Sequence, residues 1–484
     1  MRFPRVIALA GAILVVTACS GEDDAYPQNG GGTGAGAAGG QAGNVGGSSG
    51  NVSGSGNSAG ASSGATATGG ASGGGGSTGG TGSPGGGGGS AGTTGGSLNG
   101  GSSNGGTDGG GSSNGGSANG GTGGGGSTGM YACDGSTDGY TTLMIKSGST
   151  WTVTNGGEQV HSGSDMEAAL RAAYGSLTPG RSTKESILVQ GSGDISASSQ
   201  VGIPSFTVVN FCGTLNVSGT PSGSDRSPLY ARNATDIEIP NLKMTGSPQY
   251  GIFFRGTNNM HLGQIDLRLT SSAGIGIRVD TSGKAGTDTN FNENLTIDYV
   301  YGSGMSSHIV ETYGISKITI GSVEGDNVGE CGVLLNRSIN ANIDLVSCTD
   351  CATGTGYAAF RMANNNGVIG GSHDTVNIVV KSVVARGGGR GVFSVSGSGA
   401  ARIDHVDIEG TGNNSILLEN AHNVTVGASA KQSRIADSGQ LRIAGTSSDI
   451  LIQNIAVSGT TIAENPCATN STWTDVNGAP ANCN

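Results

Sequence analysis

The clearest pattern along the chain is a short unit that recurs between about residues 180 and 465. Each unit has a small residue, two or three apolar residues and then a polar residue, as in residues 251–255 and 332–336. The intervals between the final polar residues are mostly 23 or 25 residues, and two intervals of 33 residues indicate one coil plus an insertion. These final residues are Arg255, Arg278, Glu311, Asn336, Arg361, Ser394, Glu419 and Arg442.

Between these units lies a second run in which apolar and polar residues alternate. The runs include residues 294–297, 317–320, 342–345, 377–380 and 423–426. A period of two is typical of a strand with one face inward. Two or three strands in each repeat of about 20–25 residues predict a solenoid whose coils stack on one another. Leucine-rich repeats share this repeat length, but the chain lacks their leucine and asparagine framework and their helical half.

One amphipathic helix is predicted before the repeats, over about residues 165–174. Ser164 and Glu167 have the spacing of a capping box, and Gly175 is a suitable end. The apolar positions with helical spacing are Met166, Ala169, Leu170, Ala173 and Tyr174. Their stripe must be buried against another element, so we expect the helix to cap the open end of the solenoid.

In rung pattern and low aromatic content, residues of about 180–465 resemble the pectate-lyase-like right-handed parallel β-helix superfamily. The resemblance implies an all-β fold, a right-handed parallel β-helix. It also favours polysaccharide lyases and glycoside hydrolases, although non-catalytic adhesins and epimerases share the fold. Some pectate lyases of this fold hold calcium through aspartates on a shared sheet, so the resemblance raises calcium as a cofactor. Here the aspartates fall at different phases of the repeat, and we predict no metal site: Asp225, Asp236, Asp266, Asp280, Asp298 and Asp344.

The N-terminus has the features of an export signal over residues 1–18. Two arginines precede an apolar run over residues 6–16, which is too short to span a bilayer as a mature helix. Residues 16–19 (Val-Thr-Ala-Cys) resemble a bacterial lipobox, which implies cleavage before Cys19 and lipidation of Cys19. By resemblance to lipoprotein sorting, Ser20 favours the outer membrane or cell surface. The alternative is an ordinary signal peptide with a chance cysteine.

Residues 19–129 are predicted to form a lipidated, disordered tether before a folded domain at residues 130–484. Much of the 97-residue glycine content lies in this stretch, which has almost nothing apolar to bury. A flexible coil of about 100 residues has a root-mean-square reach of roughly 50–60 Å. The folded domain ends in a tail at residues 466–484.

The cysteine count and the charge narrow the function classes. Of eight cysteines, seven remain after Cys19, so at least one lacks a partner within the chain. Cys467 and Cys483 are the preferred disulfide, and Cys348 and Cys351 have CxxC spacing without a second metal-binding pair. A net charge of -11 argues against nucleic-acid binding. The expected chain is a monomer whose partners are a polysaccharide and, through the lipid alone, a membrane.

The eight polar positions are expected to face outward in one strip, if the apolar residue before each of them points inward. One interpretation is a solvated face on which alternating charges reduce repulsion. The other is a substrate groove in which arginines bind carboxylates or hydroxyls of a sugar chain. Arg390 joins this groove from a glycine-rich turn at residues 386–390. The candidate substrate-binding residues are Arg278, Arg390, Asn336, Glu419 and Arg442.

Residues 307–313 hold the candidate catalytic side chains. Glu311 and Tyr313 share one face of a strand, and His308 joins them only if it lies in the preceding turn. Removing a proton next to a uronic carboxylate requires a base and a cation, so Glu311, His308 or Tyr313 is the expected base. Arg278 or Arg361 is then the expected cation. Alternatively, His308 is a turn residue bonded to backbone.

These residues favour a surface-anchored polysaccharide lyase. A glycoside hydrolase is the first alternative, and it requires two carboxylates about 5–9.5 Å apart. Glu311 and Glu419 are four coils apart, so the second carboxylate would come from a loop near Glu311: Asp326, Glu330, Asp280 or Glu293. A non-catalytic carbohydrate-binding or adhesion module is the second alternative. Tyrosines beside the repeats can stack on sugar rings in any of these functions: Tyr250, Tyr313 and Tyr357.

Overall fold

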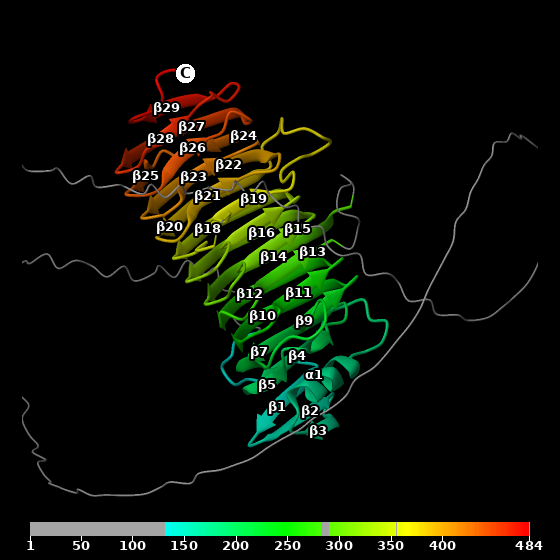
Figure 1. Cartoon of the computed structure of the whole chain (residues 1–484). Coiled ribbons are helices and arrows are strands. Elements are labelled where there is room, and N and C mark those ends of the chain that lie inside the picture. The colour runs from blue at the N-terminus through cyan, green and yellow to red at the C-terminus, as the bar shows by residue number, and fades with distance from the viewer. Residues whose placement is uncertain (1–130, 282–289, 355, 484) are drawn as a thin grey trace, which may run out of the picture. The chain divides into compact units, whose positions relative to one another are not determined.

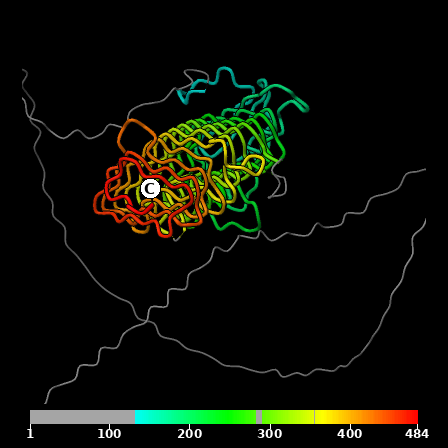
Figure 2. The backbone as a smooth tube through the Cα atoms, turned by 90° about the horizontal axis from the view of Figure 1, so that it is seen from above, coloured from blue at the N-terminus to red at the C-terminus, as the bar shows by residue number. Residues whose placement is uncertain are grey.

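The computed structural model describes residues 131–281, 290–354 and 356–483. The expected export signal, the lipidation site at Cys19 and the glycine-rich tether lie outside the described residues. The folded part is a right-handed parallel β-helix of about 12 turns, as predicted (Figure 1). A view turned by 90° shows the coils stacked one behind another (Figure 2).

One side of the solenoid is sheet B, an 11-stranded parallel sheet in the described residues. Its strands are short, and the eight strands from β11 to β26 coincide with the eight recurring units of the sequence. In spatial order they are β6 (Gln200–Gly202), β9 (Ser227–Arg232), β11 (Tyr250–Arg255), β13 (Ile275–Asp280), β15 (Val310–Tyr313), β17 (Val333–Asn336), β19 (Phe360–Ala363), β21 (Arg390–Ser394), β23 (Asn414–Leu418), β26 (Gln440–Ile443) and β28 (Ile462–Glu464).

The other strands belong to sheet A, which includes 18 strands within the described ranges. Its strands are β1 (Thr142–Ser147), β2 (Thr150–Asn155), β3 (Glu158–Gly163), β4 (Glu185–Gln190), β5 (Gly193–Ser196), β7 (Thr207–Cys212), β8 (Thr214–Ser218), β10 (Thr235–Gly246), β12 (Asn258–Leu269), β14 (Asn292–Ser303), β16 (Ile315–Asp326), β18 (Ile339–Thr349), β20 (Ile378–Arg386), β22 (Ser398–Glu409), β24 (Ala421–Val426), β25 (Ser433–Ala436), β27 (Ser448–Ser458) and β29 (Thr472–Val476). Strand β29 pairs with β27, so part of the expected tail extends the solenoid.

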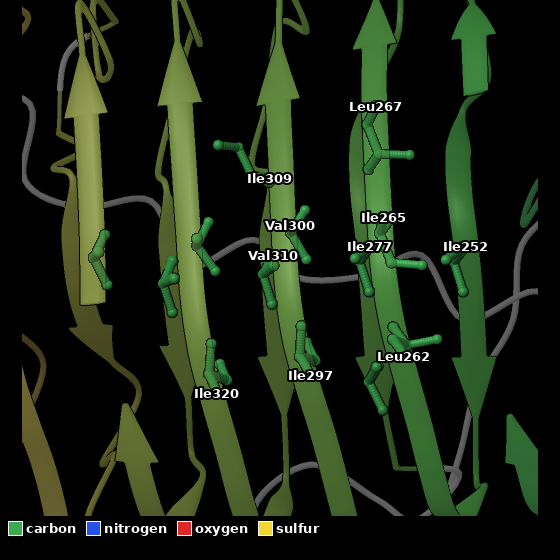
Figure 3. Close-up of a cluster of buried hydrophobic side chains, with 14 of the residues drawn as sticks. Ile252, Leu262, Ile265, Leu267, Ile277, Ile297, Val300, Ile309, Val310 and Ile320 are labelled. Carbon is green, nitrogen blue, oxygen red and sulfur yellow. The ribbon is translucent and has the colours of Figure 1, made fainter. Parts of the chain in front are cut away.

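The core lies between the two sheets and consists of apolar side chains that repeat at the same register in successive coils (Figure 3). Ile252, Ile277 and Val310 stack in sheet B and are fully buried. Leu262, Ile297 and Ile320 form a matching stack in sheet A. Each such side chain contributes about 1.5–3 kcal/mol on burial, so the repeated positions are what stabilise the stack.

Several successive coils enter sheet A at a residue with positive φ. Asp236, Asn259, Asn294 and Lys317 occupy this corner, with φ between 55° and 65°. Asn294 donates to the side-chain oxygen of Asn259 at 2.7 Å, so the corner residues bond from coil to coil. Asparagine and aspartate tolerate left-handed backbone, which is why they recur at this corner.

The N-terminal end contains the predicted helix and an unpredicted antiparallel sheet. Helix α1 (Met166–Gly175) buries its apolar stripe, and Asp165 rather than Ser164 is the N-cap. The carboxylate of Asp165 accepts from the backbone N–H of Ala168 at 2.9 Å, which places the cap one residue later than the capping-box spacing indicates. Strands β1–β3 pair antiparallel beside it. Their turns contain Gly148, Gly156 and Gly157 with positive φ, which is a hairpin signal in the sequence.

The predicted disulfide between Cys467 and Cys483 is confirmed. Cys133 pairs with Cys212 and Cys348 with Cys351. Cys331 is a buried free thiol, and burial raises its pKa to about 12. The thiol therefore stays protonated at neutral pH.

Stacked inward positions predict a strong contrast between adjacent residues of one strand. Ile320→Ala should lower the free energy of unfolding by about 2–5 kcal/mol because it empties a fully buried position. Thr319→Ala, at the exposed neighbour, should change it by less than about 0.5 kcal/mol. Urea denaturation followed by circular dichroism measures both, and equal effects would contradict the inward register of β16.

Candidate functional site

The register of sheet B defines one central column of outward side chains. It is Phe253, Arg278, Glu311, Leu334, Arg361, Phe393, Leu417 and Arg442. Four of the eight expected members belong to it. Arg255 and Asn336 lie in the neighbouring column, aligned with Asp280 and Tyr313. Ser394 aligns with the buried Met362 and is itself buried, and Glu419 directly follows β23.

The expected strip fails because the recurring units contain either two or three apolar residues. A unit with three apolar residues places one of them, such as Phe253, in the outward column. Its final polar residue then falls two positions further along the strand. Because side chains alternate between faces, a shift of two changes the column and a shift of one changes the face.

The central column is also not a solvent-exposed strip. Arg278 is 5% exposed and Glu311 is 6% exposed, so both charged side chains are buried at the surface of sheet B. This contradicts the expectation that they project into solvent along a groove.

Arg278 and Glu311 belong to an ionic ladder that spans five successive coils. We define the ionic ladder as Asp225, Arg255, Asp280, Arg278, Glu311 and Asn336. Arg278 donates to Glu311 at 2.5 Å and to Asp280 at 3.1 Å. Arg255 donates to both oxygens of Asp280, at 2.8 and 2.9 Å, and to Asp225 at 2.8 Å. Opposite charges therefore alternate along the ladder, and each buried charge has a partner.

Both carboxylate oxygens of Glu311 already accept hydrogen bonds from neighbouring coils. One oxygen accepts from Arg278, and the other accepts from the side-chain amide of Asn336 at 2.9 Å. Burial raises the pKa of Glu311, and the Arg278 charge opposes this shift. Saturated bonding and burial favour a structural function for the predicted base.

The aspartates of the ladder do not fit the calcium site that the family resemblance raises. Asp225 and Asp280 are the two that come together on sheet B, and Arg255 lies between them as a shared cation. Elsewhere in the described ranges, no three His, Cys, Asp or Glu side chains are grouped so as to hold a metal ion.

His308 lies in the turn before β15, which is the condition under which it was expected to join Glu311. However, both of its ring nitrogens are occupied. Nδ1 accepts from the backbone N–H of Cys331 at 3.1 Å, so the proton is on Nε2, which lies 3.1 Å from Glu330. Burial, with smaller contributions from Arg361 and Arg278, lowers the pKa of His308 to about 3. His308 is therefore neutral and held by backbone, as the alternative interpretation stated.

The turns before β15, β17 and β19 bring a second group of polar side chains together. Ser307 donates to Glu330, and the Glu330 side chain is 24% exposed. The ring of Tyr357 packs edge-on to His308, with centroids 5.5 Å apart. Burial and then Glu330 raise the pKa of Tyr357 to about 12. Glu330 was expected only as one of several loop carboxylates. Its separation of one repeat from Ser307 could have predicted from the sequence that the two side chains are neighbours.

Beside this group, Arg361 lacks the carboxylate partners that Arg278 and Arg255 have. Its guanidinium carbon lies 5.1 Å from the centre of the Tyr357 ring and 5.2 Å from that of Phe393. Its Nε is buried and has no hydrogen-bond partner. Among the described residues, no carboxylate lies within ion-pair distance of this half-buried cation. Its column neighbours, Leu334 and Phe393, are apolar and cannot neutralise it.

Arg390 lies next to Arg361 and packs over the same Phe393 ring, at 5.0 Å. It donates to the side-chain oxygen of Asn414 at 3.1 Å. The two cations lie over the same ring, and burial and then the Arg361 charge lower the pKa of Arg390. We call Tyr357, Arg361, Arg390 and Phe393 the arginine–aromatic cluster.

The other predicted residues are spread along the sheet. Tyr313 is half-buried and aligns with Asp280 and Asn336, so it shares a face with Glu311 as expected. Glu419 is exposed. Arg442 is exposed in the central column, three coils beyond Arg361. No protein-family model, curated protein or solved structure matches the chain. None of the described helices is long and apolar enough to span a bilayer.

The ionic ladder predicts different effects for two arginines of one column. Arg278→Ala should lower the free energy of unfolding by about 3–5 kcal/mol, because it leaves the buried Glu311 without its cation. Arg442→Ala, at the exposed position, should change it by less than about 0.5 kcal/mol. Urea denaturation at pH 7 measures both, and a small effect of Arg278→Ala would show that the ladder does not stabilise the fold.

His308 predicts a loss of stability in acid. Its pKa is about 3 in the folded chain and about 6.5 when unfolded, so the unfolded chain takes up the proton first. The stability from the neutral ring is complete above pH 6.5 and is lost as the pH falls toward 3. At pH 4.5 the loss is roughly 2.7 kcal/mol relative to pH 7.5, because pH 4.5 lies two units below the unfolded pKa and still above the folded one.

His308→Gln should lack this part of the pH dependence. The free energy of unfolding of both proteins, measured at pH 7.5 and pH 4.5, gives the comparison. The values at pH 7.5 report only the lost contacts of the ring. Equal changes between the two pH values in both proteins would contradict the neutral, buried histidine.

Proposed function

We propose that the chain binds an anionic polysaccharide, such as a uronate polymer, through the arginine–aromatic cluster on sheet B. The observation that carries this proposal is that, among the described residues, no carboxylate lies within ion-pair distance of Arg361 and its buried Nε has no hydrogen-bond partner. A carboxylate of a ligand can accept two parallel bonds from a guanidinium, which is the strongest arrangement available to it. Such a ligand would neutralise a cation that the column leaves unpaired.

Two aromatic rings contact the Arg361 guanidinium and limit its mobility, which favours ligand binding. Tyr357 and Phe393 hold the guanidinium by cation–π contacts. A side chain already held in place loses less conformational entropy when it binds. Tyr357 is half-buried, so the accessible part of its ring could also contact a sugar ring.

The regular stacking of sheet B supports an extended ligand. Arg442 is three coils from Arg361 in the same column, which corresponds to about 14 Å at 4.8 Å per coil. A polymer along this column would meet cations at both positions. If residues 1–18 are an export signal and Cys19 is lipidated, this surface would be displayed outside the cell on a flexible tether.

A polysaccharide lyase remains the second candidate, with different residues from those first expected. Glu330 is a partly exposed carboxylate beside Tyr357, and the guanidinium of Arg361 lies 5.1 Å from the centre of the Tyr357 ring. In β-elimination, Glu330 would take the proton next to the uronic carboxylate while Arg361 binds that carboxylate. The Tyr357 hydroxyl, protonated at neutral pH, would supply the proton to the departing sugar oxygen. Glycoside hydrolysis is less favoured, because Glu311 is fully engaged in the ladder.

The binding proposal predicts that Arg361→Ala weakens binding of uronate polymers by at least tenfold. Loss of a charge-assisted hydrogen-bond pair is worth about 1.5–3 kcal/mol, and about 1.4 kcal/mol is tenfold. Affinity electrophoresis of the full-length chain with polygalacturonate, alginate and hyaluronate measures this. Arg434→Ala is the matched control, since Arg434 is exposed but pairs with Asp407 and Glu409.

The same mixtures distinguish binding from lysis. Absorbance near 235 nm reports the unsaturated product of β-elimination, and Glu330→Gln should abolish any such signal without abolishing binding. Retarded migration without absorbance would identify a binding module. If none of the polymers retards the wild-type chain, or if Arg361→Ala binds as tightly, the proposal is wrong.

A further inference from the structure

Two tyrosines lie side by side on the outward face of sheet A, away from the residues considered so far. Tyr299 and Tyr301 are two residues apart on β14, and Val300 between them is fully buried in the core. Because side chains alternate along a strand, both rings are on the outer face. Both are half-buried there, so each ring keeps an accessible part.

The rings are fixed by neighbours in adjacent coils. The Tyr299 hydroxyl donates to Glu324 at 3.1 Å. The guanidinium of Arg268 lies 4.9 Å from the centre of the Tyr301 ring. Arg268 is in turn bonded to both oxygens of Asp266, at 3.0 and 3.1 Å. Each ring therefore has a set orientation before any ligand arrives.

Small and polar side chains surround the pair. In the register of the sheet, Tyr299 lies between Gln264 and Ser322, and Tyr301 lies between Asp266 and Glu324. The neighbour of Tyr299 in the next coil is therefore a small side chain, Ser322. The surface thus combines aromatic rings with amide, hydroxyl and carboxylate groups, which can bond sugar hydroxyls.

The negative charge of this surface favours a neutral ligand over an anionic one. Asp266 and Glu324 carry two negative charges beside the rings, against one positive charge on Arg268. A uronate or sulfated polymer would be repelled here, whereas hydroxyl groups of a neutral sugar can donate to carboxylates. We propose that Tyr299 and Tyr301 form a binding surface for a neutral polysaccharide, independent of the anionic site on sheet B.

Affinity electrophoresis of the full-length chain in gels containing β-glucan, xyloglucan or galactomannan tests this proposal. At least one polymer should retard the wild-type chain, and Tyr299→Ala with Tyr301→Ala should lower the affinity at least tenfold. Tyr299→Phe with Tyr301→Phe is the matched control, because it keeps both rings and should keep most of the binding. Thermal melting of each variant separates loss of binding from loss of folding.

The sheet B variant separates this proposal from the proposed function. Arg361→Ala should leave binding of the neutral polymer unchanged, and the double alanine variant should leave binding of polygalacturonate unchanged. No retardation by any of the three neutral polymers, or equal retardation of the wild type and a folded double alanine variant, would overturn the proposal. Either result leaves the anionic site on sheet B unaffected.

Discussion

The register between successive coils is the constraint on which the other features of this structure depend. Each side chain lies about 4.8 Å from the equivalent side chain of the next coil, on both sides. Inward, this spacing favours repeated apolar residues such as Ile252, Ile277 and Val310. On the outer face, the same spacing disfavours like charges in neighbouring coils unless another side chain separates them. A charged residue in this solenoid therefore has its electrostatic environment largely determined by the coils before and after it.

The two parts of sheet B meet this constraint differently. In the ionic ladder, Arg278 is followed by Glu311, so neighbouring coils neutralise each other and the pair can be buried. Arg361 is preceded by Leu334 and followed by Phe393, and neither can accept its hydrogen bonds. The same column thus contains Arg278, whose charge is neutralised by neighbouring carboxylates, and Arg361, for which the described residues supply no carboxylate within ion-pair distance. Arg361 is therefore a better candidate than Glu311 for contact with a ligand.

Much of the fold could be predicted from the sequence because the repeat is a local pattern. The coil length, the capping helix and the Cys467–Cys483 disulfide follow from spacing alone. The sequence did not predict which side chains form the central column of sheet B, because units with two and three apolar residues end at different register positions. Burial of Glu311 could not be predicted either, because it depends on Arg278 and Asn336 in adjacent coils. Arg361 was expected as the catalytic cation and Arg390 as a substrate-binding side chain, but the ring that both contact, Phe393, could be found only from the register.

The two outer faces of the solenoid also differ in the net charge beside their aromatic rings. On sheet B, Arg361 and Arg390 are cations held by aromatic rings, with an amide rather than a carboxylate bonded to Arg390. On sheet A, Asp266 and Glu324 leave an excess of negative charge beside two tyrosines. Aromatic rings are common to both faces, so stacking on sugars does not distinguish them. The sign of the neighbouring charge distinguishes the two faces, because a carboxylated sugar is favoured on sheet B and disfavoured on sheet A.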